Sequence, residues 1–400
     1  MELKVEIKSF VDAVNWVTKN YNGKDDRAYV ALTIDENGNG KISHTNTTSY
    51  MKSDYTVLDV NFDNDDETEA EFAIDGNFLR KFSKAIASSD GALTLSKNLK
   101  SKRTSLEAKT KSGKFTLPLY DAKISKEPKV FELGEVDDNE FFDMLIRVSK
   151  LCDTNTSGSS MFTGAVDFGF NTEDKKIKLF ATDRFALSEV VLDFTPASSD
   201  DEEVEEVLSK HLLLPYDKAG LVAATKGIST SISIIAESGN KGIMRVGYSF
   251  PDGRIALFSL LDASTFPNVD AMKKKALDPA TNHITVSKSD LMNAISVVSS
   301  LAWEEDHIYL TISQDGMTIS DSSNQNALSI EHSSVEYEGD EPYRAKFLRA
   351  TLNESFSPIT TADVTLKWGS ESAAFVFEPI TEDGKAIDTV FVMSVLAKNE

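Results

Sequence analysis

Residues 284–298 read ITVSKSDLMNAISVV and hold a complete strand-to-helix unit. The first three residues alternate apolar, polar and apolar, as in a half-buried strand. Ser287 and Asp290 follow with the spacing of a helix capping box. From Leu291 onward the apolar residues recur at intervals of three and four, which is typical of an amphipathic helix. The stretch therefore predicts a short strand that leads directly into a helix.

This strand-to-helix unit occurs six times along the chain. The copies start near residues 3, 72, 130, 212, 284 and 343, so the intervals are 58 to 82 residues. Five of the six predicted helices have their own start signal. The other signals are Ser9 with Asp12, Asp75, the acidic turn 137–140, and Pro215 with Asp217. Intervals of this length are too long for common solenoid repeats, so we expect repeated subdomains.

Alternating apolar segments lie between the predicted helices and indicate further strands. These segments are 28–34, 41–44, 92–95, 114–119, 176–181, 231–235, 245–250, 308–312, 317–320 and 364–368. Each repeat thus reads as one strand, one helix and about three more strands, which predicts an α+β fold. Pairing the repeats predicts three similar domains, at residues 1–128, 129–267 and 268–400.

Composition indicates a globular protein of two or three domains, because 400 residues are 40% apolar and 26% charged. The only cysteine, Cys152, cannot form an internal disulfide, so we expect a reducing compartment. No stretch is apolar enough for a membrane span, and the first residues lack the apolar core of a signal peptide. We therefore expect a cytoplasmic protein without a membrane partner.

The net charge of −22 argues against a protein that binds nucleic acid over its whole surface. The charge is unevenly distributed, however. Six predicted helix windows (8–21, 75–88, 137–152, 216–226, 288–300 and 344–356) together carry +4, and the remaining residues carry −26. A cationic lining inside an acidic shell suits a protein that surrounds a polyanion. Ordinary solvent-facing helices would give the same count, so this alternative stays open.

Three local motifs give the chain its resemblance to a known family. Residues 181–187 read ATDRFAL, residues 266–272 read FPNVDAM, and residues 390–396 read VFVMSVL. Together with the six repeats, these motifs resemble the bacterial β sliding clamp of DNA polymerase III. The corresponding family motifs are a strand that ends in Ala-Thr-Asp-Gly-His-Arg-Leu, a Phe-Pro-Asp-Tyr segment, and a C-terminal Val-Val-Met-Pro-Met segment.

The resemblance implies a sliding-clamp fold, with helices inside a ring, sheets outside, and two chains joined head to tail as a homodimer. It also implies a processivity factor that encircles double-stranded DNA. Peptides of the polymerase and the clamp loader would bind a hydrophobic cleft between the middle and last domains. The residues implied for this cleft are Phe162, Thr182, Arg184, Phe185, Leu187, Pro267, Met272, Phe391, Val392, Met393 and Val395.

Cations on or near the predicted helices would face the DNA in such a ring. These residues are Lys24, Arg80, Lys81, Lys84, Arg147, Lys150, Lys218, Lys226, Arg344, Lys346 and Arg349. The resemblance implies no enzymatic activity, no cofactor and no metal.

The chain departs from the family pattern at several motif positions. Arg184-Phe185-Ala186 stands in place of Gly-His-Arg, Ala271 stands where the family often has Arg, and Ser394 replaces Pro. A tyrosine pair that the family uses beside DNA aligns with Ser160 and Met161. We therefore expect a divergent clamp with an altered peptide preference, and a viral origin stays open.

Other motifs have a plainer interpretation. Residues 35–42 resemble the start of a calcium-binding loop but lack its terminal Glu, so they predict a β-hairpin turn. The five histidines have no metal-ligand spacing. The charge run SSDDEEVEE at 198–206 predicts a solvated loop.

Two rival functions remain open from the sequence. One is an acidic protein that mimics DNA and blocks a DNA-binding partner, which the net charge permits. The other is a metal-dependent nuclease built on Asp167 and Asp183. The chain contains no phosphate-binding loop of the Gly-x-x-x-x-Gly-Lys-Ser/Thr type and no Gly-x-Ser-x-Gly motif.

Overall fold

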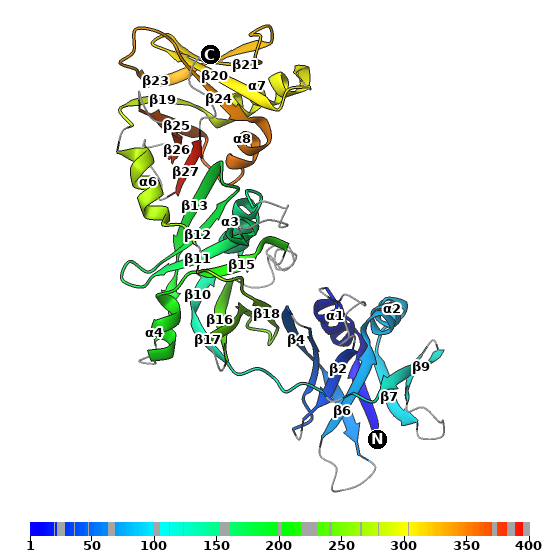
Figure 1. Ribbon diagram of the computed structural model, residues 1–400. Helices are drawn as coiled ribbons and strands as arrows, with labels where there is room; N and C mark the ends of the chain where they lie inside the picture. The colour runs from blue at the N-terminus through cyan, green and yellow to red at the C-terminus, as the bar shows by residue number, and fades with distance from the viewer. Residues whose placement is uncertain are drawn as a thin grey trace. The chain divides into compact units, whose positions relative to one another are not determined.

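The computed structural model describes residues 1–19, 21, 29–35, 37–46, 48–62, 69–98, 105–111, 113–122, 124–152, 161–198, 202–217, 230–239, 242–264, 266–278, 280–302, 304–369, 374–381 and 389–394. At 98, 161, 162, 239, 242 and 389–394 the description covers the backbone only. The chain forms two compact units (Figure 1). Unit 1 comprises Met1–Asp138, Pro196–Val204 and Gly227–Leu260, and unit 2 comprises Asn139–Thr195, Glu205–Lys226 and Leu261–Glu400.

Unit 1 is built on one large antiparallel sheet of fourteen strands. In spatial order the strands are β14 (Thr195–Pro196), β10 (Val130–Asp137), β16 (Ser231–Gly239), β17 (Gly242–Ser249), β18 (Ile255–Ser259), β4 (Ser49–Tyr55), β3 (Gly40–Thr45), β2 (Tyr29–Ile34), β6 (Ala70–Asp75), β9 (Gly113–Tyr120), β8 (Ser105–Thr110), β7 (Ala92–Asn98), β1 (Glu2–Glu6) and β5 (Val57–Asn61). The β18–β4 pair joins segments about 200 residues apart in sequence, with Ala256 opposite Met51.

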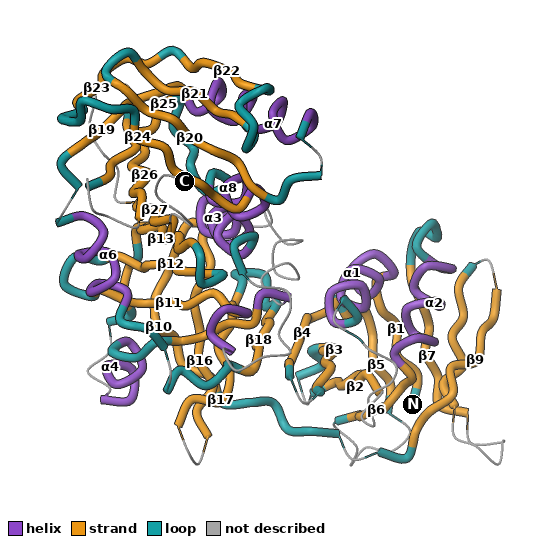
Figure 2. Tube along the Cα trace, turned by 45° about the horizontal axis from the view of Figure 1, so that its top comes forward, coloured by secondary structure: helices purple, strands orange, loops and turns teal. Residues whose placement is uncertain are grey.

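Two helices pack side by side on one face of this sheet, α1 (Ile7–Val17) and α2 (Gly76–Ile86) (Figure 2). Each follows directly from a strand and buries an apolar stripe that includes Phe10 in α1 and Leu79 in α2. The side chain of Asp75 accepts the backbone N–H of Phe78 at 2.7 Å and caps α2 as predicted.

Unit 2 contains a sheet of nine strands and a sheet of four. The larger sheet runs β15 (Leu212–Pro215), β11 (Ala165–Asn171), β12 (Lys176–Thr182), β13 (Ala186–Asp193), β27 (Thr389–Ser394), β26 (Ala374–Ile380), β25 (Asp363–Trp368), β19 (Asn282–Ser287) and β23 (His332–Glu336). The smaller sheet runs β22 (Ala327–Ile330), β21 (Gly316–Ser320), β20 (His307–Ser313) and β24 (Tyr343–Leu348).

Four further helices belong wholly or almost wholly to unit 2: α3 (Asp138–Ser149), α6 (Val269–Leu277), α7 (Lys288–Leu301) and α8 (Arg349–Ser355), together with a 3-10 turn at Met161–Gly164. Phe141 of α3 packs edge-on against Phe168 of β11. Phe356, which follows α8, does the same against Phe377 of β26. These aromatic contacts fix α3 and the end of α8 to the larger sheet.

The structure confirms five of the six predicted strand-to-helix units: β1–α1, β6–α2, β10–α3, β19–α7 and β24–α8. In the fourth, β15 leads into a helical turn at 216 and 217, and the rest lies outside the described residues. The expected calcium-loop lookalike is a hairpin turn between β2 and β3, where Asp35 accepts the N–H groups of Asn37 and Asn39. Gly38 has φ +78°, which suits glycine in such a turn. Cys152 is buried, as expected of an inert thiol.

Three expectations about secondary structure were wrong. The charge run at 198–206 is not a loop throughout, because α4 (Glu202–Leu208) begins inside it and buries Val204, Val207 and Leu208 at helical spacing. The first helix begins at Ile7 without a side-chain cap, so Ser9 and Asp12 form no capping box. Arg344 and Lys346 lie on strand β24, since the last helix begins only at Arg349.

The division into three domains stays a prediction. β18 continues the sheet of unit 1 from β4, and β13 continues the larger sheet of unit 2 into β27, so both sheets run across the predicted boundaries. None of the helices within the described ranges has the length and apolar character that crossing a bilayer requires.

Candidate functional site

Asp183 organises the turn between β12 and β13, which carries the ATDRFAL motif. Its Oδ1 accepts the backbone N–H groups of Phe185 at 2.8 Å and of Ala186 at 2.7 Å. The hydroxyl of Thr182 donates to the carbonyl of Ala186 at 2.6 Å and accepts the N–H of Arg184 at 3.1 Å. Short polar side chains that bond to nearby backbone groups are typical of tight turns. The turn is therefore held by four local hydrogen bonds.

Helix α8 supports this turn from a distant part of the chain. The hydroxyl of Thr351 donates to Oδ2 of Asp183 at 2.8 Å. Burial, followed by the negative charge of Asp183, raises the pKa of Glu354 on the same helix. Both oxygens of Asp183 are thus engaged in structural hydrogen bonds, which leaves the carboxylate poorly suited to bind a metal ion for nuclease chemistry.

The turn presents two side chains to solvent. Phe185 is 44% exposed, an unusual state for a large aromatic residue. Arg184 is exposed as well, and its backbone has φ +82°. Positive φ is costly for a residue with a Cβ, so this position favours glycine or asparagine over arginine.

The C-terminal strand β27 lies next to this turn. It pairs with β13, so that Met393 is opposite Ala186, Val392 opposite Leu187, and Phe391 opposite Ser188. The sheet register thereby brings together the 181–187 and 390–396 motifs, which are about 200 residues apart in sequence. Leu187 is 2% exposed and packs in a small apolar cluster with Phe180, Ala276 and Val376.

The third motif leads into α6, which packs on this cluster. The side chain of Asn268 accepts the N–H of Ala271 at 2.9 Å and caps the helix. Val269 and Leu277 pack against the cluster. Lys273 forms an ion pair with Glu189 of β13, whose side chain is 6% exposed. Met272 is 42% exposed.

A hollow of about 430 Å³ lies beside the N-terminus of α6. Phe266 stacks on the ring of His211 with centroids 4.5 Å apart and meets Phe180 edge-on. His211 Nδ1 lies 2.7 Å from Oδ2 of Asp167, and this hydrogen bond raises the pKa of His211. Asp167 is 3% exposed and is therefore a structural partner of His211.

The structure brings together part of the predicted cleft. Thr182, Arg184, Phe185 and Leu187 lie on one turn and its strand, and the backbone at Phe391, Val392 and Met393 pairs beside them. Pro267 and Met272 belong to the segment that packs over the same strands. The side chain of Phe162 and the whole of Val395 lie outside the described residues. The peptide-binding role of all the cleft positions stays a prediction.

Among the predicted DNA-facing residues, Arg80, Arg349 and Arg147 donate to backbone carbonyls at or just after the ends of neighbouring helices, and Arg344 donates to the carbonyls of Asp321 and Ser322. Arg80 bonds to the carbonyl of Thr18 at the end of α1. Arg349 bonds to the carbonyls of Ser299 and Ala302, at 3.3 and 3.4 Å, at the end of α7. Arg147 bonds to Ser357 after α8 at 3.0 Å. Helix C-termini have unsatisfied carbonyls and a negative dipole end, so these contacts hold neighbouring helices together.

The remaining cations differ in their surroundings. Lys81 and Lys84 are exposed on α2, and Lys150 is exposed just after α3. Arg344 stacks over Tyr309 at 4.3 Å and, like Lys346, is half-buried on β24. Lys24, Lys218 and Lys226 lie outside the described residues.

The observed helix bounds reduce the predicted charge segregation. α2 carries three cations and no acid, α3 carries three acids and one arginine, and α1, α7 and α8 each carry one cation and one acid. These helices are therefore close to neutral in a chain of net charge −22. Among these helices, the excess of positive charge is concentrated on α2. The positive charge that was expected on the helix of the last repeat lies partly on strand β24, at Arg344 and Lys346.

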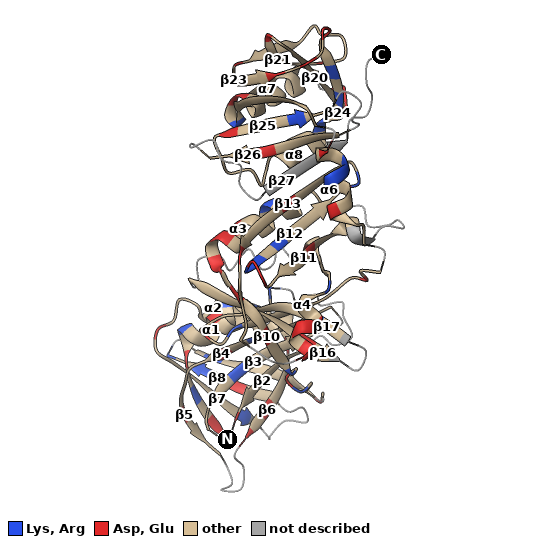
Figure 3. Ribbon diagram, turned by 90° about the vertical axis from the view of Figure 1, so that its left-hand side faces the viewer, with Lys and Arg blue, Asp and Glu red and all other residues tan. Residues whose placement is uncertain are grey.

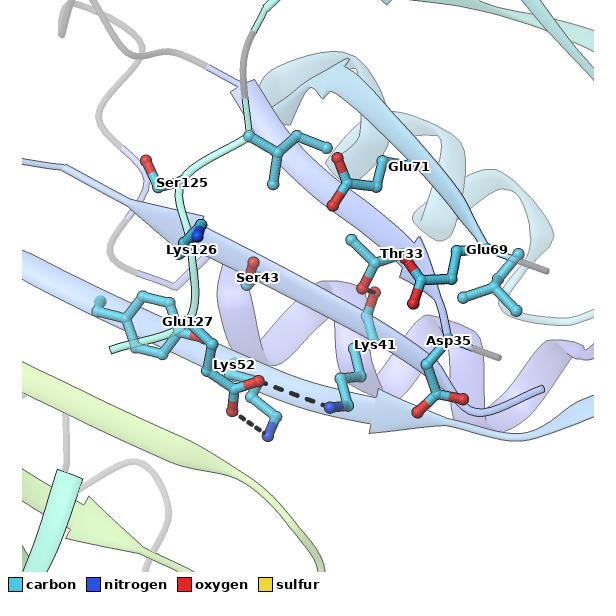
Figure 4. A pocket seen from close by; sticks show the side chains of 13 residues that line it. Thr33, Asp35, Lys41, Ser43, Lys52, Glu69, Glu71, Ser125, Lys126 and Glu127 are labelled. Atoms are coloured by element: carbon cyan, nitrogen blue, oxygen red, sulfur yellow. Dashed lines mark hydrogen bonds and ion pairs between the residues drawn. The ribbon is translucent and has the colours of Figure 1, made fainter. Parts of the chain in front are cut away.

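A second hollow, of about 280 Å³, opens on the sheet of unit 1 (Figure 4). Residues 124–127, which we call the strap, cross one side of it. The carboxylate of Glu127 lies 2.6 Å from Lys52 and 3.5 Å from Lys41, on neighbouring strands β4 and β3. The hollow thus marks where the strap is fastened to the sheet.

Sequence reasoning missed several residues that shape the site. Thr351 shows no motif, and its role follows only from the packing of α8 against the 183–186 turn. His211 has no metal-like spacing, and its partner Asp167 lies 44 residues away. α6 had a readable signal, an Asn cap followed by apolar residues at helical spacing.

Comparison with solved structures identifies the fold. No family model matches the sequence, and no curated protein matches it. The sliding clamp of Bacillus subtilis DNA polymerase superposes with a TM-score of 0.77 at 12% identity, over 100% of both chains. The DNA polymerase III β subunit of Pseudomonas aeruginosa gives 0.76 at 14% identity, over 99% of this chain and 100% of that one.

The Helicobacter pylori β clamp bound to a DNA ligase peptide gives a TM-score of 0.73 at 16% identity, again over 99% of this chain and 100% of that one. The similarity extends over the whole chain and includes all six repeats. The chain therefore has the fold of the bacterial DNA polymerase III β sliding clamps.

Proposed function

We propose that the protein is a DNA sliding clamp, a processivity factor that encircles duplex DNA and tethers a polymerase through a peptide-binding cleft. The observation that carries this proposal is the full-length match to clamp structures, which includes both ends of the chain. A closed ring cannot leave the duplex without opening or reaching an end, so it does not need a high affinity for DNA. This explains how a chain of net charge −22 can act on DNA without a large basic surface.

Two different exposed edges support a head-to-tail homodimer. In unit 1, residues 113–118 of β9 pair with β8 on one side, and no strand of the described part of the chain pairs on the other. Phe115 on this strand is 36% exposed, and Phe78 on α2 is 40% exposed. Unpaired strand edges with apolar neighbours tend to associate with other chains, so a specific partner commonly covers them.

Unit 2 offers a complementary edge. Strand β22 ends the four-stranded sheet, and its Leu328 is 36% exposed. Val297 and Leu301 of α7 are 37% and 58% exposed. Because the two edges differ in sequence, their pairing is heterologous, and such pairing forms a ring when its rotation closes. We propose that β9 of one chain pairs with β22 of the partner.

The DNA-facing role falls mainly to exposed lysines. Lys81, Lys84 and Lys150 would screen phosphates, with Arg80, Arg147 and Arg349 adding charge from positions where they also brace the helices. Few and weak phosphate contacts allow sliding. The cleft beside the 183–186 turn would bind peptides of the polymerase and the clamp loader, and no catalytic step is proposed.

Particle imaging tests the ring directly. We expect purified chains to form closed particles with a central hole and a mass of about 88 kDa, twice the 44.0 kDa of one chain. If the particles are compact monomers without a hole, and remain monomers when the protein concentration is raised well above that used for imaging, the proposal is contradicted. Divalent-metal-dependent cleavage of plasmid DNA by the same preparation would instead support the nuclease alternative.

A further inference from the structure

The predicted cleft combines exposed apolar side chains with exposed cations. Phe185 and Met272 are 44% and 42% exposed. Arg184 is exposed beside Phe185, and Lys274 and Lys275 are exposed on the helix that carries Met272. Figure 3 shows the colour of basic residues on helix α6. In a chain of net charge −22, the sequence thus places three exposed cations beside exposed apolar residues.

Arg184 occupies a backbone conformation that arginine disfavours. Its φ of +82° lies in the left-handed region, where a residue with a Cβ costs roughly 1–2 kcal/mol. Glycine or asparagine would adopt it more easily. A strained residue retained at an exposed position suggests that its side chain, rather than its backbone, is what the site needs.

The turn fixes the backbone at Arg184 before any ligand binds. Asp183 accepts the N–H groups of Phe185 and Ala186, Thr182 accepts the N–H of Arg184, and Thr351 ties Asp183 to α8. Leu187, three residues after Arg184, is buried in the apolar cluster under α6. A charge carried on a rigid backbone loses less entropy on binding than one on a mobile loop.

Helix α6 supplies a second, independent source of positive charge. It contains Lys273, Lys274 and Lys275 against a single acid, Asp270. Lys273 is neutralised by Glu189, but its two neighbours are exposed. Ala276 on the same helix packs on Leu187, so α6 and the 183–186 turn border the same group of strands.

We propose that this site selects acidic peptides, in which apolar anchor residues are flanked by Asp or Glu, and that Arg184 is a specificity-determining residue. The inference rests on the proposed function, because it names the chemistry of the peptides that the cleft binds. Apolar anchors would contact Phe185 and Met272. The acidic flanks would pair with Arg184 and with Lys274 or Lys275.

Fluorescence anisotropy with synthetic peptides tests this selection. Three labelled short peptides would share the same Leu and Phe anchors and carry flanks of Asp, Asn or Lys. We expect the Asp peptide to bind the full-length protein about tenfold more tightly than the Asn peptide, and the Lys peptide to bind most weakly. The preference should shrink as the salt concentration rises.

Two substitutions at one position separate charge from backbone. Arg184→Lys keeps the charge, and we expect Asp-peptide affinity within about threefold of wild type. Arg184→Asn removes the charge at a residue that tolerates positive φ, so Asp-peptide affinity should fall about three- to tenfold. Affinity for the Asn peptide should not change, and thermal stability should be equal or higher. Lys111→Asn, on an exposed turn of unit 1, removes the same single charge and is the matched charge control.

Equal binding of all three peptides would overturn the selection while leaving the cleft itself in place. Failure of every peptide to bind would overturn both this inference and the proposed tether. The last experiment measures the binding of a short labelled DNA duplex to the wild type and to the variants. If Arg184→Asn and Lys274→Glu weaken duplex binding but not Asp-peptide binding, these cations serve nucleic acid and the inference is wrong.

Discussion

Asp183 holds the turn that borders the proposed cleft. It accepts hydrogen bonds from Phe185, Ala186 and Thr351, all between 2.7 and 2.8 Å. We expect Asp183→Ala to lower the free energy of unfolding by about 2 kcal/mol, because three donors lose their acceptor. Urea denaturation measures this loss. Asp183→Asn keeps one carbonyl oxygen for the two N–H groups, so a loss as large as that of the alanine variant would contradict this explanation.

His211 gives the site a predictable response to pH. Its hydrogen bond to Asp167 raises its pKa above the usual 6.5. A group with a raised pKa in the folded state stabilises the protein fully below pH 6.5 and loses that contribution as pH rises through the folded pKa. The stability difference between wild type and His211→Gln should therefore shrink between about pH 6 and pH 8. A difference that is constant or grows over that range would refute the pairing.

At the residue scale, the sequence indicates some contacts and conceals others. The positions of Thr182, Phe185 and Leu187 could be predicted because they lie within one short motif. The contacts of Asp183 with Thr351 and of His211 with Asp167 depend on packing between segments 168 and 44 residues apart. Single-sequence patterns carry no information about such pairs.

The strap is an element whose attachment can be tested. Burial by itself would raise the pKa of Glu127, but Lys52 and Lys41 outweigh burial and lower it. Glu127 is 44% exposed, so solvent weakens the pair. We expect Glu127→Gln to cost about 0.5–1 kcal/mol at low salt and less at high salt, with faster amide exchange at 124–127. Unchanged exchange in the strap would show that Glu127 does not fasten it.

At the element scale, apolar periodicity predicted the strands and helices well where it was strong. The helix after Ser287 is capped as expected, by the Ser287 side chain and the N–H of Asp290. Two failures have physical causes. In α4, high charge concealed the spacing of Val204, Val207 and Leu208. In the last repeat, the sequence did not reveal that the strand continues to Leu348 before α8 begins.

The assembly of the whole molecule can be tested at its proposed contact. Leu301 is 58% exposed on α7, beside the edge strand β22. We expect Leu301→Lys to convert the dimer of about 88 kDa to the 44.0 kDa monomer, because it places a charge in an apolar interface. Sedimentation measures this change. Leu58→Lys, at a position 54% exposed on edge strand β5, is the matched control and should remain dimeric.

The fold of the whole molecule could be predicted, because the six repeats and the three local motifs together resemble one known family. The charge pattern was less predictable, since cations assigned to one helix belong to strand β24 and several arginines brace neighbouring helices. The sequence alone does not predict ring closure, which in the proposed dimer depends on the fit between β9 of one chain and β22 of the other.

Encirclement of DNA is most directly tested by threading the protein onto a linear duplex and then blocking both ends with bound protein. After a wash in high salt, we expect the protein to remain on end-blocked duplexes and to leave open-ended duplexes of the same sequence. Cutting the blocked duplex should then release it. Equal loss from blocked and open duplexes would contradict a closed ring around DNA.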